Sequence, residues 1–311
     1  MKVYNEKELM KLSWFGFKRL IRNVLLLSPI NAIIREMMQL YPLQIRYRIP
    51  LTINQTTYET REGKKIFLQS PDLCDIAREI YWSGGVRRKK SDKLVMYCFE
   101  YFVSKSDLMI DIGAYSGFFS CVAAITNTKI CVYSYEILPS AYLLLWKNII
   151  SNNAVGNIKP SLCGISDSPS SIIMPLIISG SVLPSSLSLG SKFKRGITIP
   201  VTTIDSQIEV EKYNHCVIKI DVEGYEKNVL LGAKRILFSL RPDIICEILP
   251  DSVDYMDIEQ QLLLLSYNFF QFTDEGLLMK EKLIPDNAGR DWLFTTKTEE
   301  EIYWLISYVN I

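Results

Sequence analysis

Short apolar runs alternate with stretches of helical periodicity over most of the chain beyond about residue 93. The runs carry many β-branched side chains, which indicates buried strands. Strands that alternate with helices predict βαβ units and a parallel sheet covered on both faces. The predicted strands are 108–111, 129–135, 158–162, 216–220 and 244–248, and the predicted helices are 93–104, 117–126, 139–150, 225–238 and 255–266.

The first 92 residues lack this alternation. We therefore expect an N-terminal helical and β-rich extension (1–92) before the main domain (93–311). Residues 168–203 interrupt the main pattern with Ser, Gly and Pro, which indicates an inserted loop or hairpin. Within the extension, the pattern predicts a helix over 8–40 that breaks near Ser28-Pro29, a β-rich segment over 41–70 and a short helix over 72–82.

Charge is distributed unevenly, although the formal net charge is only +1. Residues 1–100 contain 18 Lys/Arg and 10 Asp/Glu, whereas the remainder contains 17 and 24. The basic helix over 8–40 could lie on an anionic membrane surface, but packing on its own domain or on a partner is the favoured interpretation. The basic loop over 83–90 is usually only solvated, but it could also meet an anionic substrate group.

No apolar run reaches the roughly 18–20 residues that span a bilayer, and no signal peptide is apparent. The seven cysteines are spread singly, without a CxxC motif, which is typical of buried thiols in a reducing compartment. We therefore expect a cytoplasmic protein, with peripheral contact to the inner membrane face as an option. The oligomeric state cannot be predicted.

The strongest local motif is the sequence Asp111-Ile112-Gly113-Ala114-Tyr115-Ser116-Gly117, which follows an apolar strand and opens a helix. Glycine lets the backbone turn sharply and approach a ligand closely. The free amides at a helix N-terminus favour a carboxylate or phosphate. On its own, however, this pattern also fits ordinary strand-to-helix turns.

An acid at the end of the next strand strengthens the motif. Glu136 lies where dinucleotide-binding folds place the carboxylate that accepts the ribose hydroxyls. The turn lacks the middle glycine that lets a pyrophosphate approach closely. This pattern favours S-adenosylmethionine over NAD as the cofactor.

A third motif places several acids at the end of one strand, in Val217-Ile218-Lys219-Ile220-Asp221-Val222-Glu223-Gly224-Tyr225-Glu226. Ligands of open α/β sheets bind at this edge. Asp221 and Glu226 could alternatively be helix-capping acids. Glu247 ends the next strand and should project at the same edge. His215, the only histidine, precedes the strand and is interpreted as structural or exposed.

Together these motifs resemble the FkbM-like methyltransferases over about residues 105–250. The chain departs from the family pattern in two places: Tyr115 stands where Asn is usual, and two residues separate Glu136 from Pro139. The matching segments, in order, are 110–120, Glu136 with Pro139, Leu145 with Asn148 and Asn152, Thr203-Ile204-Asp205, 218–226, Leu230 with Gly232, Leu237, Arg241-Pro242 and Glu247.

The resemblance implies an S-adenosylmethionine-dependent O-methyltransferase with a Rossmann-like class I fold. This fold has a seven-stranded, mostly parallel sheet, and its antiparallel last strand would be 292–295. The resemblance places Gly113 and Gly117 at the methionine end of the cofactor, Glu136 at the ribose, and Asp221 beside the sulfonium and the acceptor. The candidate cofactor-binding residues are Asp111, Gly113, Ala114, Tyr115, Gly117, Glu136, Ile137, Cys163, Gly164 and Asp221, with Cys163 and Gly164 beside the adenine.

Methyl transfer to a hydroxyl group needs a base, because a protonated alcohol is a poor nucleophile. Asp221 is the first candidate, with Glu223 and Glu247 behind it. Carboxylates also suit Mg²⁺, so Asp221 and Glu247 could hold a divalent metal, although nothing in the sequence requires one.

The expected acceptor is a sugar hydroxyl in a cell-surface glycan or its lipid-linked precursor. A small specialised metabolite is the alternative acceptor, and a degenerate domain that binds without turnover is the alternative function. An NAD-dependent oxidoreductase would need a tighter glycine motif. Nucleic acid is not expected, because the predicted catalytic domain is acidic and would repel phosphates.

Overall fold

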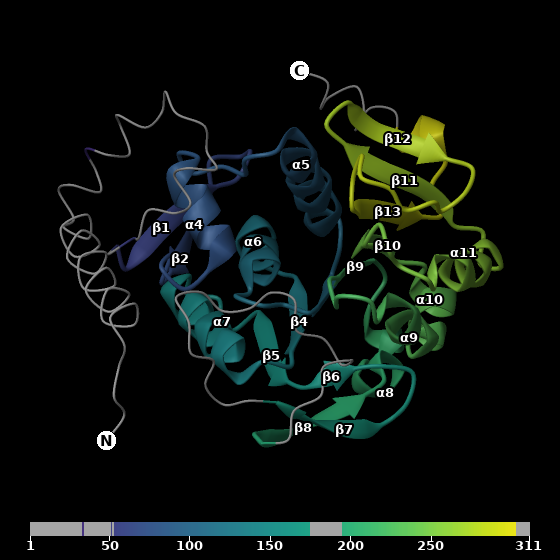
Figure 1. The fold of residues 1–311 in the computed structure, drawn as a ribbon, viewed down its shortest axis with the longest axis horizontal. Coiled ribbons are helices and arrows are strands. Elements are labelled where there is room, and N and C mark those ends of the chain that lie inside the picture. The colour runs from purple at the N-terminus through teal and green to yellow at the C-terminus, as the bar shows by residue number, and fades with distance from the viewer. Residues whose placement is uncertain (1–32, 34–50, 52, 175–194, 303–311) are drawn as a thin grey trace, which may run out of the picture.

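An eight-stranded sheet runs through the centre of the protein in the computed structural model (Figure 1). The structure describes residues 33, 51, 53–174 and 195–302. The predicted helix over 8–40 lies outside these ranges apart from Ile33, as do nearly all of residues 41–52 and the centre of the predicted insertion. Membrane contact through residues 8–40 therefore stays a prediction.

The strand order is β12-β11-β13-β10-β9-β3-β4-β5, and the five strands from β10 to β5 are parallel. β13 lies between β10 and β11 and is antiparallel to both, which confirms the antiparallel strand predicted at 292–295. β12 adds an eighth strand at the edge. The strands are β3 (Leu108–Ile112), β4 (Cys131–Glu136), β5 (Ile158–Leu162), β9 (Cys216–Ile220), β10 (Asp243–Glu247), β11 (Asn268–Thr273), β12 (Gly276–Lys280) and β13 (Asp291–Thr295).

Helices cover both faces of this sheet, as the apolar strands predict. Alternate residues of β3 belong to two separate cores: Met109 packs on one face, and Leu108 and Ile110 pack on the other. The first face carries α5 (Lys90–Ser104), α6 (Phe118–Thr126) and α7 (Pro139–Ser151), and the second carries α8 (Ile204–Gln207), α9 (Glu226–Leu231), α10 (Lys234–Leu240) and α11 (Tyr255–Leu263).

The prediction of a single helix over 225–238 is wrong in one respect, because this segment forms two helices, α9 and α10. The division falls at Gly232, where an added Cβ would lie 2.0 Å from the carbonyl oxygen of Ser166. The chain therefore approaches a neighbouring loop too closely for a side chain. Asp205 then accepts hydrogen bonds from the amides of Arg235 and Ile236 at the start of α10.

The insertion forms part of a separate three-stranded sheet. β8 (Ile197–Thr202) lies between β6 (Gly164–Ile165) and β7 (Ser170–Met174). β8 is parallel to β6 and antiparallel to β7. The predicted insertion therefore contributes the antiparallel strands β7 and β8, and β6 places the segment after β5 next to them.

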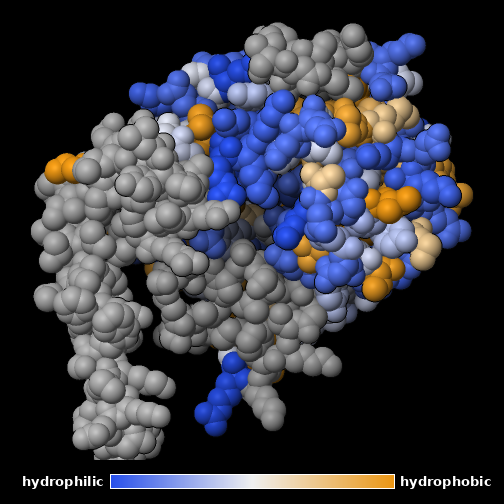
Figure 2. Space-filling model, turned by 45° about the horizontal axis from the view of Figure 1, so that its top comes forward, coloured by the Kyte–Doolittle hydropathy of each residue, from blue (hydrophilic) through white to orange (hydrophobic). Residues whose placement is uncertain are grey.

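The N-terminal extension contains a hairpin of β1 (Gln55–Glu59) and β2 (Lys65–Gln69), followed by α4 (Asp75–Trp82). Tyr58, Ile66 and Leu68 are buried in the same core as α5, α6 and α7. Hydrophilic residues dominate the described surface visible in Figure 2, with hydrophobic residues scattered among them. No helix in the described part of the chain is long and apolar enough to cross a membrane.

Candidate active site

A cavity of about 880 Å³ lies at the carboxyl ends of the parallel strands. Its volume falls in the range of about 300–1,000 Å³ that is usual for small-molecule sites. The ends of β3, β4, β9 and β10 contribute to it, and so do α4 and the loop before α5. The predicted site residues that line it are Gly113, Tyr115, Glu136, Ile137, Cys163, Gly164, Asp221, Glu223 and Glu247.

The turn after β3 depends on glycine at two positions. Gly113 has a φ of +78°, and an added Cβ would lie 1.8 Å from the carbonyl oxygen of Asp221. Gly117 has a φ of +74°, and its Cβ would lie 2.1 Å from Cδ1 of Leu145 on α7. At both positions, the positive φ and the lack of room for a Cβ disfavour every residue other than glycine. The turn is thereby pressed against the end of β9 on one side and against α7 on the other.

Three residues predicted to bind the cofactor, Asp111, Ala114 and Gly117, do not line the cavity. They shape the turn instead. Asp111 is buried and accepts hydrogen bonds from the amide and hydroxyl groups of Ser120 in the first turn of α6. Burial raises its pKa to about 6, although these hydrogen bonds oppose the rise. The carboxyl group therefore anchors the helix to the strand.

Glu136 ends β4 and lies at the cavity surface while being only 6% exposed. Its carboxylate accepts hydrogen bonds from the amides of Tyr115 at 2.6 Å and Leu138 at 2.7 Å. Burial raises the pKa of this group to about 7, and the two amides only partly offset that rise. Each carboxylate oxygen has two lone pairs. Glu136 can therefore still accept hydrogen bonds from hydroxyl groups in the cavity.

Tyr115 is the turn residue that departs from the family pattern. Its φ of +50° is unusual for a residue with a side chain. The half-buried ring packs against the core and lines the cavity together with Asp75 and Ile76 of α4. Tyr115 therefore joins the extension to the turn, and its amide fixes Glu136.

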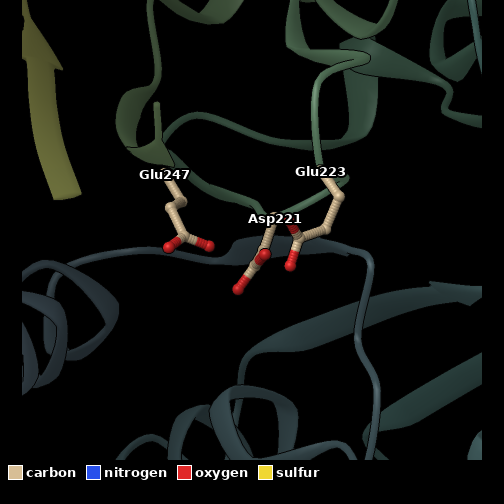
Figure 3. Close-up of side chains that lie close together, drawn as sticks. All are labelled: Asp221, Glu223 and Glu247. Carbon is tan, nitrogen blue, oxygen red and sulfur yellow. The ribbon is translucent and has the colours of Figure 1, made fainter. Parts of the chain in front are cut away.

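Three carboxylates converge at the ends of β9 and β10. Asp221, Glu223 and Glu247 each place one oxygen within 4.8 Å of the others, and Asp221 lies between the other two in Figure 3. Burial and, after it, the negative charges of Asp221 and Asp291 together raise the pKa of Glu247 to about 9. Burial is also the main cause of a raised pKa at Glu223. The sequence-based expectation that these acids meet at one sheet edge is met.

Lys219 is the residue of this site that sequence reasoning missed. It is 2% exposed, and its Nζ lies 3.8 Å from Oδ2 of Asp221 and 3.3 Å from Oδ1 of Asp291. It also lies 5.4 Å from the centre of the Phe119 ring. Burial acts to lower its pKa, but the surrounding carboxylates outweigh burial and raise it. A lone lysine inside the apolar run of β9 was the signal.

The basic loop over 83–90 contributes in two ways. Arg87 forms ion pairs at 3.1 Å with both Glu79 of α4 and Asp92 of α5, so it joins two helices. Arg88 and Lys89 line the cavity. His215 is exposed, and its backbone bonds to the start of β3 at the opposite end of the strands, as predicted.

The cluster could also offer oxygen ligands to a divalent cation, since carboxylates suit Mg²⁺. Lys219 already supplies one positive charge beside Asp221. The optional metal stays a prediction.

Comparison with known proteins places the chain among methyltransferases. The strand order and the cavity at the strand ends define a Rossmann-like class I methyltransferase fold. The methyltransferase FkbM domain matches residues 111–270, just over half of the 311 residues. The chain belongs to the FkbM methyltransferase family.

Solved structures similar to this chain include several methyltransferases. Methyltransferase FkbM from Methylobacillus flagellatus KT is 18% identical, with a TM-score of 0.43, over 71% of this chain and 60% of that one. The chain thus spans less than two thirds of that protein. M. jannaschii TYW2, solved in complex with AdoMet, is 11% identical, with a TM-score of 0.35, over 78% and 83%. Precorrin-6y C5,15-methyltransferase from Geobacter metallireducens GS-15 is 11% identical, with a TM-score of 0.33, over 65% and 86%. A search of curated proteins found no match.

Proposed function

We propose that this protein is an S-adenosylmethionine-dependent O-methyltransferase that acts on a sugar hydroxyl of a cell-surface glycan or its precursor. One observation carries the proposal. Three carboxylates converge within 4.8 Å of one another in a cavity that is also lined by Gly113 and the buried Glu136. Membership of the FkbM family supports it.

Together, the residues that line the cavity suit the parts of S-adenosylmethionine. Glu136 can accept the ribose hydroxyls, and Cys163 and Gly164 would border the adenine. Gly113 lines the cavity next to Asp221, where the methionine end would lie. The cofactor, when bound, supplies an electrophilic methyl group on a sulfonium.

The chain's own groups would align the acceptor and take its proton. With the cofactor bound, the hydroxyl oxygen of the acceptor would receive the methyl group and would give up its proton to a base of this chain. Asp221 accepts the hydroxyl proton during attack. Nζ of Lys219 lies 3.8 Å from Oδ2 of Asp221 and forms an ion pair with it. Glu247, with its pKa raised to about 9, keeps its proton at neutral pH and can donate a hydrogen bond.

Calorimetric titration with S-adenosylmethionine, and separately with NAD, tests the cofactor. We expect saturable binding of the former alone. Glu136→Gln should weaken binding about tenfold or more, because hydrogen bonds to a charged group contribute about 1.5–3 kcal/mol. Glu59→Gln, on the exposed edge of β1, is the matched control.

The pH dependence of cofactor binding gives a second test of the role of Glu136. Ribose hydroxyls donate to the ionised carboxylate, and the pKa of Glu136 is raised to about 7. Affinity should therefore rise as pH increases through 7, and the slope should disappear in Glu136→Gln. Binding that is unchanged between pH 6 and 8 in the wild-type protein would contradict this role for Glu136.

Release of S-adenosylhomocysteine in the presence of glycan acceptors distinguishes an enzyme from a degenerate binding protein. Asp221→Asn should abolish release while leaving cofactor binding largely intact. Cofactor binding without turnover on any glycan or small hydroxyl acceptor would favour the binding-protein alternative. Turnover on small metabolites alone would favour the other alternative.

A further inference from the structure

Helix α4 contributes charged side chains of both signs to the wall of the cavity. Asp75, Arg78 and Glu79 all line it. Asp75 begins α4 and Arg78 follows three residues later. Residues at this spacing are neighbours on the surface of a helix. The extension therefore places a carboxylate and a guanidinium group side by side at the cavity.

Asp75 and Arg78 differ from Glu79 in what they contact. Glu79 pairs with Arg87 at 3.1 Å, whereas neither Asp75 nor Arg78 forms an ion pair among the described residues. Nη2 of Arg78 donates to the carbonyl oxygen of Asp72, and its Nε is buried without a hydrogen-bond partner in the same part of the chain. Burial raises the pKa of Asp75, and the charge of Arg78 opposes that rise. The two side chains are thus close enough for their charges to interact, but they are not joined.

The turn after β3 connects this charged pair to the proposed cofactor site. The side chain of Tyr115, which belongs to that turn, is joined to the backbone of Asp75 by a hydrogen bond. The amide of Tyr115 donates to Glu136 at 2.6 Å. In the proposed function, Glu136 holds the ribose and Gly113, two residues before Tyr115, lies at the methionine end. The start of α4 therefore lies against the turn that the amino-acid end of the cofactor would contact.

We propose that α4 binds the amino-acid end of S-adenosylmethionine, with Arg78 holding the α-carboxylate and Asp75 the α-ammonium group. This inference rests on the proposed methyltransferase function and adds residues of the extension to the cofactor site. The amino-acid end carries one charge of each sign at neutral pH, and the pair on α4 presents the two opposite charges. Arginine binds carboxylates through paired N–H donors. A ligand group with only one charge would be attracted by one member of the pair and repelled by the other.

The test measures binding of a series of adenosine ligands by calorimetry. S-adenosylhomocysteine carries both charged groups, its decarboxylated form carries only the ammonium group, and 5′-methylthioadenosine carries neither. All of these ligands share the same adenine and ribose. We expect S-adenosylhomocysteine to bind about tenfold or more tightly than 5′-methylthioadenosine, as hydrogen bonds between charged groups allow.

Each variant has its own expected pattern across the series. Arg78→Gln should weaken S-adenosylhomocysteine about tenfold and leave the other two ligands unchanged. Asp75→Asn should weaken S-adenosylhomocysteine and its decarboxylated form, and it should leave 5′-methylthioadenosine unchanged. Glu136→Gln should weaken all the ligands by the same factor, because they share the ribose. The matched controls, Arg195→Gln and Glu59→Gln, remove exposed charges outside the cavity lining and should change none of the affinities.

Two results would overturn the role of α4. Equal losses for S-adenosylhomocysteine and 5′-methylthioadenosine in the α4 variants would make α4 only a structural wall, and unchanged affinities would show that the pair does not contact the cofactor. Failure of the proposed function gives a different pattern. If the folded wild-type protein binds none of the ligands, the proposed function and this inference both fail. If it binds them and Glu136→Gln weakens them all, but the α4 variants do not discriminate among them, only the role of α4 is wrong.

Discussion

At the scale of single residues, the charge balance of the site depends on Lys219. Its ammonium group is almost fully buried between Asp221 and Asp291, and it lies beside the Phe119 ring. A buried charge is tolerated only when it is paired. The two carboxylates are less buried, at 39% and 26% side-chain exposure, so they can be partly solvated if the lysine is lost.

Lys219→Met should therefore reduce turnover more than it reduces stability. We expect kcat to fall at least tenfold, because Asp221 loses the ion-pair partner that holds its carboxylate in place. Loss of a buried pair with two partly exposed partners should cost about 1–3 kcal/mol of unfolding free energy. Urea unfolding and S-adenosylhomocysteine release measure the two effects.

A second variant separates the two roles of Lys219. Lys219→Met/Asp291→Asn removes one of the unpaired carboxylates and should recover part of the stability without recovering kcat. Recovery of kcat along with stability would show that Lys219 acts only as a structural residue.

Lys219 is visible in the sequence, but its role in the site cannot be predicted from the sequence. An apolar run with one lysine predicts a buried strand, but it does not reveal what the lysine meets. Asp221 is close in sequence, whereas Asp291 lies 72 positions away and reaches Lys219 only through the β13–β10–β9 order of the sheet. The acids at the strand ends were predictable because strand polarity alone brings them to one edge.

At the scale of elements, α7 connects the turn after β3 to the hairpin of the extension. Asn148 is buried, accepts the amide of Gln69 at 2.7 Å and donates to the carbonyl of Ser116 at 2.8 Å. Asn152, one turn later, exchanges two hydrogen bonds with the backbone of Phe67. The edge of β2 is thus paired by side chains of a helix rather than by another strand.

Asn148→Ala should destabilise the protein by about 2–3 kcal/mol, because it leaves a backbone amide and a carbonyl without their partners. It should also weaken cofactor binding several-fold, since Ser116 belongs to the turn. Chemical denaturation and calorimetry measure these effects. The exposed Asn54 supplies the control Asn54→Ala. A stability loss with full cofactor affinity would show that α7 supports the hairpin but not the turn.

The same elements show what the sequence could and could not predict. The five parallel strands were predictable from their apolar runs, and α5, α6 and α7 from their periodicity. The division of the helix over 225–238 was not, because it depends on close approach of Gly232 to Ser166, a contact between distant segments. Asp111, Ala114 and Gly117 matched the motif, yet their contribution to the turn is visible only once Ser120 and Leu145 are placed beside it.

At the scale of the whole molecule, the extension and the sheet share one core. Ile66, Leu68 and Ile80 pack in the same cluster as Phe99 and Phe118. The boundary predicted at residue 92 divides the chain by pattern, and it stays a prediction. Each large apolar side chain contributes about 2 kcal/mol when buried, against a total stability of about 5–15 kcal/mol. The extension therefore supplies a substantial part of the stability of the fold.

We expect residues 53–92 and the central sheet to unfold as one cooperative unit. Ile66→Ala should lower the unfolding free energy by about 3 kcal/mol, as for other large-to-small core changes. Hydrogen exchange followed by mass spectrometry should show β1, β2, β3 and β9 losing protection at the same urea concentration, both before and after the substitution.

Phe67→Ala, on the other face of the hairpin and only half-buried, should cost less unfolding free energy. If the hairpin instead loses protection first, at a urea concentration where β3 and β9 stay protected, the extension is a separate unit. In that case the wall that α4 contributes to the cavity would open without unfolding the sheet.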